Sequence, residues 1–249
     1  DPCGVPGASN LAARKYKAIG MGQPTVTVLQ LDTHFPRVPG DVGCAETYCD
    51  DVEIIRIPRA TVADIVSNRP GDIDIEPFGD AIKAAKGEVI VTSCGFLSYW
   101  QAHLAALTDK PFISSALIGL ADLSTRYAPG EVLILTFDDQ SLTSDHLGAF
   151  PDYAEGIIGL PKTMYLRRII SSDSRVLDVP KATDDLADFI ADVVRPQHKH
   201  LLLECTNLPP YKMALQAVTD LPVADILTLI EDARPGTIHP DYLLHELSQ

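Results

Sequence analysis

The chain of 249 residues contains an internal repeat, and this repeat constrains its fold more than any other feature. The segment LAALTDKPF at 104–112 aligns without a gap with LQAVTDLPV at 215–223. The same offset aligns Cys94 with Cys205. Further upstream, Asp32 and Asp138 end two strand-like segments at a nearly matching offset. Two copies of one unit predict two similar lobes related by a pseudo-twofold axis.

Strand-like and helix-like segments alternate along both copies. Short apolar runs without polar alternation are typical of parallel strands that are buried on both faces of a sheet. Such runs lie at 25–31, 89–92, 112–115, 132–136, 201–203 and 222–225. Helical segments lie at 60–68, 80–86, 99–108, 183–195 and 210–219. Thr183 and the two aspartates after it have the residue types of a helix N-terminus. This order predicts an α/β fold of two Rossmann-like lobes with parallel sheets.

The repeat also predicts how the chain divides and where a site lies. We expect lobe one to comprise 1–118 and 224–249, with a C-terminal helix at 240–247, and lobe two to comprise 119–223. In open α/β sheets, ligands bind outside the carboxyl ends of the strands. Cys94 and Cys205 each follow such a strand. The pseudo-symmetry therefore predicts that the two thiols face each other across one cleft between the lobes.

Two facing thiols suit a reaction that inverts a carbon next to a carboxylate. One group must remove a proton from one face of the carbon while the other group delivers a proton to the opposite face. A thiol has a pKa of ~8.5, which falls at a helix N-terminus, so a cysteine can act as either partner. Each cysteine precedes a predicted helix, and we expect the helix to favour thiolate and its N–H groups to bind a carboxylate. This arrangement predicts a two-base thiol/thiolate mechanism.

Motifs around the two cysteines resemble those of a known enzyme superfamily. VIVTSCGFLSYW contains Cys94, LLLECTNLPPY contains Cys205, and both resemble motifs of the aspartate/glutamate/hydantoin racemase superfamily. The resemblance covers nearly the whole chain, including LDTHFPRVPGD at 31–41. It implies that the two cysteines are the catalytic acid/base pair, that no cofactor or metal ion is used, and that the enzyme forms a homodimer or a higher homo-oligomer.

Residues near the strand ends are candidates for substrate binding. Thr206 matches the superfamily and is expected to bind the substrate carboxylate. Gly95 and Phe96 replace the Asn-Thr pair that is usual in its amino-acid racemases, which predicts a more apolar pocket. The complete predicted set is Asp32, Thr33, Ser93, Gly95, Phe96, Ser115, Asp138, Thr206 and Asn207. Arg37 lies in a loop rich in proline and glycine, where an arginine could clamp a carboxylate, but we expect it to be a solvated surface residue.

These observations predict a cofactor-independent racemase or epimerase that acts on an amino acid or a related small carboxylate. Three alternatives stay open at this point. The superfamily also includes algal dimethylsulfoniopropionate lyases, which abstract a proton beside a carboxylate and expel a leaving group. It includes cis–trans isomerases, which use one cysteine as a nucleophile. The third alternative, from another class, is a non-catalytic protein that binds a small molecule in the cleft.

Charge and cysteine content limit the partners and the setting. The net charge of −14 disfavours nucleic acid and anionic lipid as partners. The expected partner is the small-molecule carboxylate substrate that the predicted reaction requires. No apolar run approaches the ~18–20 residues of a membrane span. The five cysteines are widely spaced, which disfavours a disulfide framework and a zinc site. We therefore expect free thiols in a reducing cytoplasm.

Overall fold

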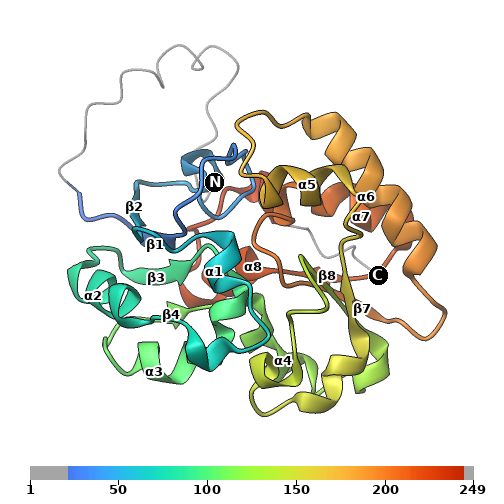
Figure 1. Ribbon diagram of the computed structural model, residues 1–249, viewed down its shortest axis with the longest axis horizontal. Helices are drawn as coiled ribbons and strands as arrows, with labels where there is room; N and C mark the ends of the chain where they lie inside the picture. The colour runs from blue at the N-terminus through green and yellow to red at the C-terminus, as the bar shows by residue number, and fades with distance from the viewer. Residues whose placement is uncertain (1–21, 244–249) are drawn as a thin grey trace.

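The computed structural model describes residues 22–243, which form two parallel four-stranded sheets (Figure 1). The first sheet has the order β2-β1-β3-β4, and the second has the order β6-β5-β7-β8. The strands of the first sheet are β1 (Val26–Gln30), β2 (Val52–Arg56), β3 (Val89–Thr92) and β4 (Phe112–Ile113). Those of the second are β5 (Val132–Thr136), β6 (Ile157–Gly159), β7 (His200–Leu203) and β8 (Val223–Ala224). The predicted α/β fold of two similar parallel sheets is confirmed.

The two sheets repeat one topology strand for strand. The offset that relates Cys94 to Cys205 also relates the bounds of β3 to those of β7, and the bounds of β4 to those of β8. Leu104 and Leu215, which occupy equivalent positions after these cysteines, are both fully buried. The internal repeat found in the sequence is therefore a repeat of structure.

Two strands and several helices differ from the sequence-based expectation. The strands β2 and β6 were not predicted because both pair at one side only, at the edge of a sheet, where burial is incomplete. The helices are α1 (Val62–Ile65), α2 (Glu76–Ala84), α3 (Gln101–Ala105), α4 (Leu120–Leu123), α5 (Tyr165–Ser171), α6 (Val179–Val193), α7 (Lys212–Thr219) and α8 (Ile226–Ala233). No helix within residues 22–243 is long and apolar enough to span a membrane.

The expected helix N-terminus at Thr183 is wrong. The helix α6 begins four residues earlier in the sequence, where the Asp178 side chain accepts a hydrogen bond from the Lys181 N–H at 3.1 Å. Pro180 fits there because the first turn leaves its N–H groups without helical partners. Thr183 instead donates its hydroxyl to the Val179 carbonyl within the helix.

The chain crosses between the sheets after β4 and returns after β8. Ile226 and Ile230 of α8 pack with Val89 of β3, so this helix covers the first sheet. A second apolar cluster includes Ile90 of β3 and Ile134 of β5, so the two sheets share one continuous core. The lobe boundaries at 118 and 224 stay a prediction. Of the helix expected at 240–247, the described part is a 3-10 helix at Pro240–Tyr242.

A buried ion pair connects the two lobes. Lys212 begins α7, which packs on the second sheet, and Asp225 caps α8, which packs on the first. The Lys212 Nζ lies 2.8 Å from Asp225 Oδ2, and the two side chains are 4% and 0% exposed. Asp225 also accepts a hydrogen bond from the Thr228 N–H at the start of α8.

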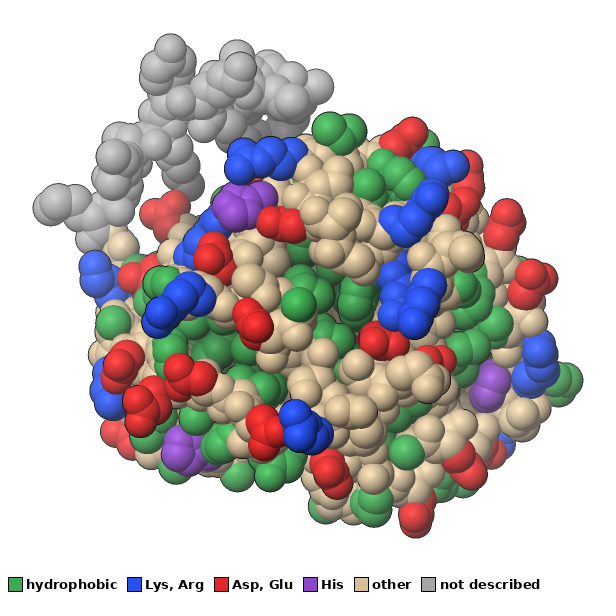
Figure 2. All heavy atoms as spheres, in the orientation of Figure 1, with side chains coloured by type: hydrophobic (Ala, Val, Ile, Leu, Met, Phe, Trp, Pro, Cys, Tyr) green, Lys and Arg blue, Asp and Glu red, His purple; other side chains and the backbone are tan. Residues whose placement is uncertain are grey.

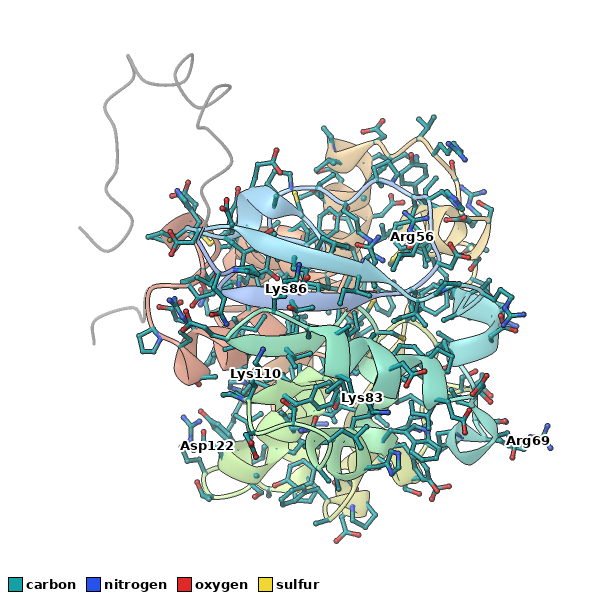
Figure 3. The ribbon with its side chains drawn as sticks, turned by 90° about the vertical axis from the view of Figure 1, so that its left-hand side faces the viewer. Arg56, Arg69, Lys83, Lys86, Lys110 and Asp122 are labelled. Carbon is teal, nitrogen blue, oxygen red and sulfur yellow. The ribbon has the colours of Figure 1, made fainter. Side chains whose placement is uncertain are left out.

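We expect Lys212→Ala to lower the free energy of unfolding by about 3–5 kcal/mol, because it leaves the buried Asp225 carboxylate without its counter-ion. Urea unfolding measures this change. The control is Lys83→Ala on α2, on the face of the molecule that Figure 3 presents. Its ion pair with Asp80 is exposed, so we expect a loss below about 1 kcal/mol. Equal losses for the two variants would contradict the proposed connection between the lobes.

Candidate active site

One pocket lies at the carboxyl ends of the two sheets and contains both predicted cysteines. Cys94 follows β3 by two residues, and Cys205 follows β7 by two residues. Both thiols are free, both line this pocket, and their residues are 8% and 7% exposed. The structure therefore brings the two sulfur atoms to one cavity from equivalent places in the repeat. Hydrophobic side chains gather near the centre of the face shown in Figure 2, with charged side chains around them.

Most of the predicted substrate-binding residues line the same pocket. They are Thr33, Ser93, Gly95, Phe96, Thr206 and Asn207. The Thr206 hydroxyl, expected to bind a carboxylate, donates a hydrogen bond to the Ser93 carbonyl at 2.5 Å. This bond connects the two cysteine loops, which are the segments that follow β3 and β7 and contain Cys94 and Cys205. The Asn207 amide donates to Asp41 at 2.8 Å, and the Cys205 Sγ lies 3.8 Å from the Asn207 Oδ1. Both side chains thus fix the loop that positions Cys205.

Three predicted residues lie outside the pocket, and local contacts occupy their polar atoms. Asp32 accepts a hydrogen bond from the Arg59 N–H at 3.1 Å and pairs with Arg56. Asp138 pairs with Arg167 at 3.2 Å. Ser115 accepts a hydrogen bond from the Leu117 N–H at the start of a 3-10 helix. The expected substrate contacts of Asp32, Asp138 and Ser115 are therefore corrected: all three stabilise loops beside the strands.

The expected lowering of the thiol pKa values is found only in part. Burial outweighs the hydrogen bonds from the backbone N–H groups of Phe96 and Asn207, which lower the pKa values of Cys94 and Cys205. Burial raises the pKa of Cys94 to about 12, and the negative charge of Glu204 raises it further. Burial, followed by the same Glu204 charge, raises the pKa of Cys205. The α-helices begin only at Gln101 and Lys212, and the segments next to the cysteines contain short 3-10 helices. The pocket therefore holds both cysteines as neutral thiols at pH 7.

Glu204 is the functional candidate that sequence reasoning missed. Its side chain lines the pocket and is 1% exposed. The Thr136 hydroxyl donates to Oε2 at 2.5 Å, and Oε1 has no partner. Burial raises the pKa of this carboxyl to about 7. The available signal was an acid directly after the apolar segment LLL, between this segment and Cys205.

Arg37 is a second correction, because it is buried and lines the pocket. Its side chain is 9% exposed and pairs with Asp41 at 3.2 Å. One guanidinium nitrogen donates to the Thr33 hydroxyl at 3.0 Å, and the Nε atom has no partner. The guanidinium carbon lies 4.6 Å from the centre of the Phe35 ring. A buried N–H donor of a cation that lines the pocket thus has no partner among the described residues.

The rest of the pocket wall is apolar. Leu31, Phe35, Val62, Val66, Phe137 and Ile170 contribute to it. Within residues 22–243, no group of three or more His, Cys, Asp or Glu side chains is arranged to hold a metal ion. The pocket thus combines one buried cation, one buried acid and two thiols in apolar surroundings.

The expectation that every cysteine is free is wrong for Cys49, which is disulfide-bonded. Cys44, Cys94 and Cys205 are free, and Cys3 lies outside the described residues. Because disulfides persist mainly in oxidising compartments, the cysteine content no longer supports a reducing cytoplasm.

No family model matches the chain. The chain is similar to known enzymes both in sequence and in fold. Dimethylsulfoniopropionate lyase 7 of Emiliania huxleyi is 30% identical over 222 residues, which cover 82% of this chain and 64% of that protein. A dimethylsulfoniopropionate lyase of Durusdinium sp. clade D is 28% identical over 214 residues, which cover 80% of this chain and 70% of that protein. The chain therefore spans less than two thirds of the first relative.

Two solved structures share the fold at low sequence identity. A glutamate racemase from Bacillus anthracis superposes with a TM-score of 0.51 and 12% identity, over 86% of this chain and 84% of that one. A variant of arylmalonate decarboxylase in its sulfate-associated form superposes with a TM-score of 0.53 and 17% identity, over 87% of this chain and 97% of that one.

We expect Gly95→Ala to damage this site, because a Cβ on Gly95 would lie 2.0 Å from Glu204 Oε1 and 2.6 Å from the Glu204 carbonyl oxygen. Thermal unfolding should show a loss of about 1–3 kcal/mol from overpacking. The control Gly119→Ala has a φ of −66° and only ordinary contacts with Leu229, so its stability should not fall. An unchanged Gly95→Ala protein would refute the close approach of Glu204.

Proposed function

We propose that this chain, which has the fold of the aspartate/glutamate/hydantoin racemase superfamily, is a lyase that acts on a small sulfonium carboxylate such as dimethylsulfoniopropionate. The supporting observation is a single pocket in which two thiols lie with the unpaired Nε of Arg37 and the unpaired Oε1 of Glu204. The relatives named dimethylsulfoniopropionate lyase align over four fifths or more of this chain. They favour elimination over the racemisation expected first.

The pocket chemistry suits a zwitterion with a methylated cation. Arg37 offers a charge-assisted N–H donor to the substrate carboxylate. A dialkylsulfonium group has no N–H donors, so it needs apolar and aromatic contacts together with negative charge. Phe35, Phe96 and Phe137 supply aromatic surface, and Glu204 supplies the negative charge. An amino acid would instead require several acceptors for its ammonium group, and Glu204 is the only acid among the described residues that line the pocket.

The reaction needs one base next to the carbon that bears the carboxylate. A thiolate removes the proton from that carbon, the C–H electron pair forms the C=C bond, and the C–S electron pair leaves with the neutral sulfide. The products are an unsaturated carboxylate and a dialkyl sulfide. The sulfide leaves without a proton, so elimination itself requires no acid. Either Cys94 or Cys205 can act as this base.

A racemase is the second candidate, and one specific observation favours it. Cys94 and Cys205 enter the same pocket from equivalent positions of the repeat, which is the arrangement that a two-base reaction uses. In that case each thiol exchanges a proton with one face of the same carbon, and no group is lost. An amino acid or a related small carboxylate would be the substrate.

Incubation of the purified full chain with dimethylsulfoniopropionate tests the lyase. We expect acrylate by NMR and dimethyl sulfide in the headspace. Replacement of the basic thiol by serine, in Cys94→Ser or Cys205→Ser, should lower kcat/KM by about 10²-fold or more. Cys44→Ser is the matched control. Cys44 is also buried and its pKa is also raised, but it lies outside the pocket, where its thiol donates a hydrogen bond to Glu46.

The same assay in deuterated water separates the alternatives. Inversion and deuterium uptake by an amino acid, abolished in both serine variants and without sulfide release, would replace the lyase by the racemase. Full lyase activity in both Cys94→Ser and Cys205→Ser would refute thiol catalysis. Binding without any turnover would identify a non-catalytic binding protein.

Replacement of Arg37 tests the proposed carboxylate contact. We expect Arg37→Met to raise KM by about 10–150-fold, which corresponds to loss of a hydrogen bond to a charged group worth about 1.5–3 kcal/mol. Arg56→Met is the control, because Arg56 pairs with Asp32 outside the pocket and should leave KM unchanged. A folded Arg37→Met enzyme with the KM of the wild type would contradict this contact.

A further inference from the structure

A buried carboxyl group lies between the two cysteine loops of the pocket. Glu204 directly precedes Cys205 in the chain. Its Oε1 atom lies against Gly95, the residue after Cys94, where a Cβ would come within 2.0 Å of it. The carboxyl group is thus in contact with the loop of one thiol and is a chain neighbour of the other.

Maintaining this acid is costly for the fold. A buried polar group without a hydrogen-bond partner loses its hydration without replacement. Glu204 has one partner for Oε2, the Thr136 hydroxyl, and none for Oε1. The position equivalent to Glu204 in the first lobe is Ser93, whose hydroxyl accepts a hydrogen bond from the Leu31 N–H. The repeat itself therefore does not require an acid at this place, which points to a role in the chemistry.

We propose that Glu204 accepts the proton of the catalytic thiol and transfers to solvent the one proton that each elimination produces. This inference rests on the proposed lyase function, and it assigns the step that a racemase would not need. Racemisation returns a proton to the substrate, whereas elimination from a sulfonium carboxylate releases one proton with the neutral sulfide and the unsaturated carboxylate.

The protons balance over one cycle. The resting site holds a Glu204 carboxylate and a neutral catalytic thiol. The thiol proton moves to Glu204, and the resulting thiolate removes the substrate proton as the C–S bond breaks. The site then holds a neutral thiol and a protonated Glu204. Loss of the Glu204 proton to water restores the resting site, and no oxidant or other reactant is required.

Electrostatics in the pocket support this exchange. The Glu204 carboxylate raises the pKa of both Cys94 and Cys205, so its protonation makes thiolate easier to form. The pKa of Glu204 is about 7, which lets it take up and release a proton near neutral pH. The site thus accommodates one negative charge that moves between sulfur and oxygen.

Other charged and titratable groups act on the same pocket. Arg37 lowers the pKa of Cys94, and Asp41 raises that of Cys205. The pKa of Tyr211, next to Cys205, is raised by burial, so Tyr211 stays neutral in this range. The charges of Arg37 and Asp41 therefore act on the two thiols in opposite directions.

We expect kcat/KM of the wild type to fall as the pH decreases through about 7, because Glu204 can accept the thiol proton only while its carboxyl group is ionised. Glu204→Gln keeps an oxygen for the Thr136 hydroxyl but accepts no proton. Its kcat/KM should be lower by about 10²-fold, and the fall near pH 7 should disappear. The control Glu76→Gln replaces an exposed acid on α2 and should leave rate and pH profile unchanged.

Thr136→Val gives an independent readout. The hydrogen bond from the Thr136 hydroxyl lowers the pKa of Glu204. Removal of this bond should therefore move the fall in kcat/KM to higher pH, while the Glu204 carboxyl group stays in place. A structural role for Glu204 would leave the position of this fall unchanged. A Glu204→Gln enzyme that retains the fall near pH 7 at the wild-type rate would overturn the proposal.

Thiol alkylation separates this inference from the choice of substrate. Mass spectrometry of Cys94 and Cys205 after iodoacetamide treatment at a series of pH values reports thiolate directly. For the wild type, the plot of alkylation rate against pH should bend near pH 7. Glu204→Gln should lose this bend, and its thiols should react about tenfold faster at pH 8.5, because the negative charge of Glu204 is gone. A bend that persists in Glu204→Gln refutes coupling of Glu204 to the thiols. Loss of the bend without lyase activity on dimethylsulfoniopropionate refutes the lyase instead.

Discussion

The burial of three ionisable side chains in one pocket, at the carboxyl ends of the two sheets, is the physical constraint on which this site depends. Burial raises the pKa of Cys94, Cys205 and Glu204 together, because each loses the hydration that stabilises its anion. Burial and mutual repulsion therefore disfavour several negative charges in the pocket at the same time, and the guanidinium of Arg37 favours one. The apolar walls that contribute to this burial are also the surface that we propose for a methylated cation.

The symmetry of the two lobes is a symmetry of the backbone. Strand order and strand bounds repeat in the two lobes, but the residues around the two cysteines do not. Gly95 in the first lobe leaves the space that the Glu204 carboxyl group of the second lobe occupies. The Thr206 hydroxyl of the second lobe binds the Ser93 carbonyl of the first. A duplicated scaffold thus provides two similar walls, and the differences between the copies make the pocket chemically directional. Such directionality suits elimination, in which one base suffices, at least as well as inversion.

Much of the architecture could be predicted because it depends on local patterns. The buried strands β1, β3, β5 and β7 have continuous apolar sequences, and the repeat relates them without reference to structure. The edge strand β2 escaped prediction because its sequence VEIIR contains charged residues that solvent accepts at a sheet edge. Asp32 and Asp138 were placed in the site because they end equivalent strands. Their carboxylates instead find partners in Arg56, Arg59 and Arg167, which come from other segments.

The sequence alone determined the α/β class, the duplication and the equivalence of Cys94 and Cys205 in the repeat, since these follow from periodicity and spacing along the chain. Only the tertiary structure decided the protonation of the thiols, the burial of Arg37 and the position of Glu204 against Gly95. The physical reason is that desolvation and charge interactions depend on what packs around a group from distant segments. Spacing in the sequence fixes which residues approach the pocket, whereas packing between the lobes fixes how much water and charge they meet there.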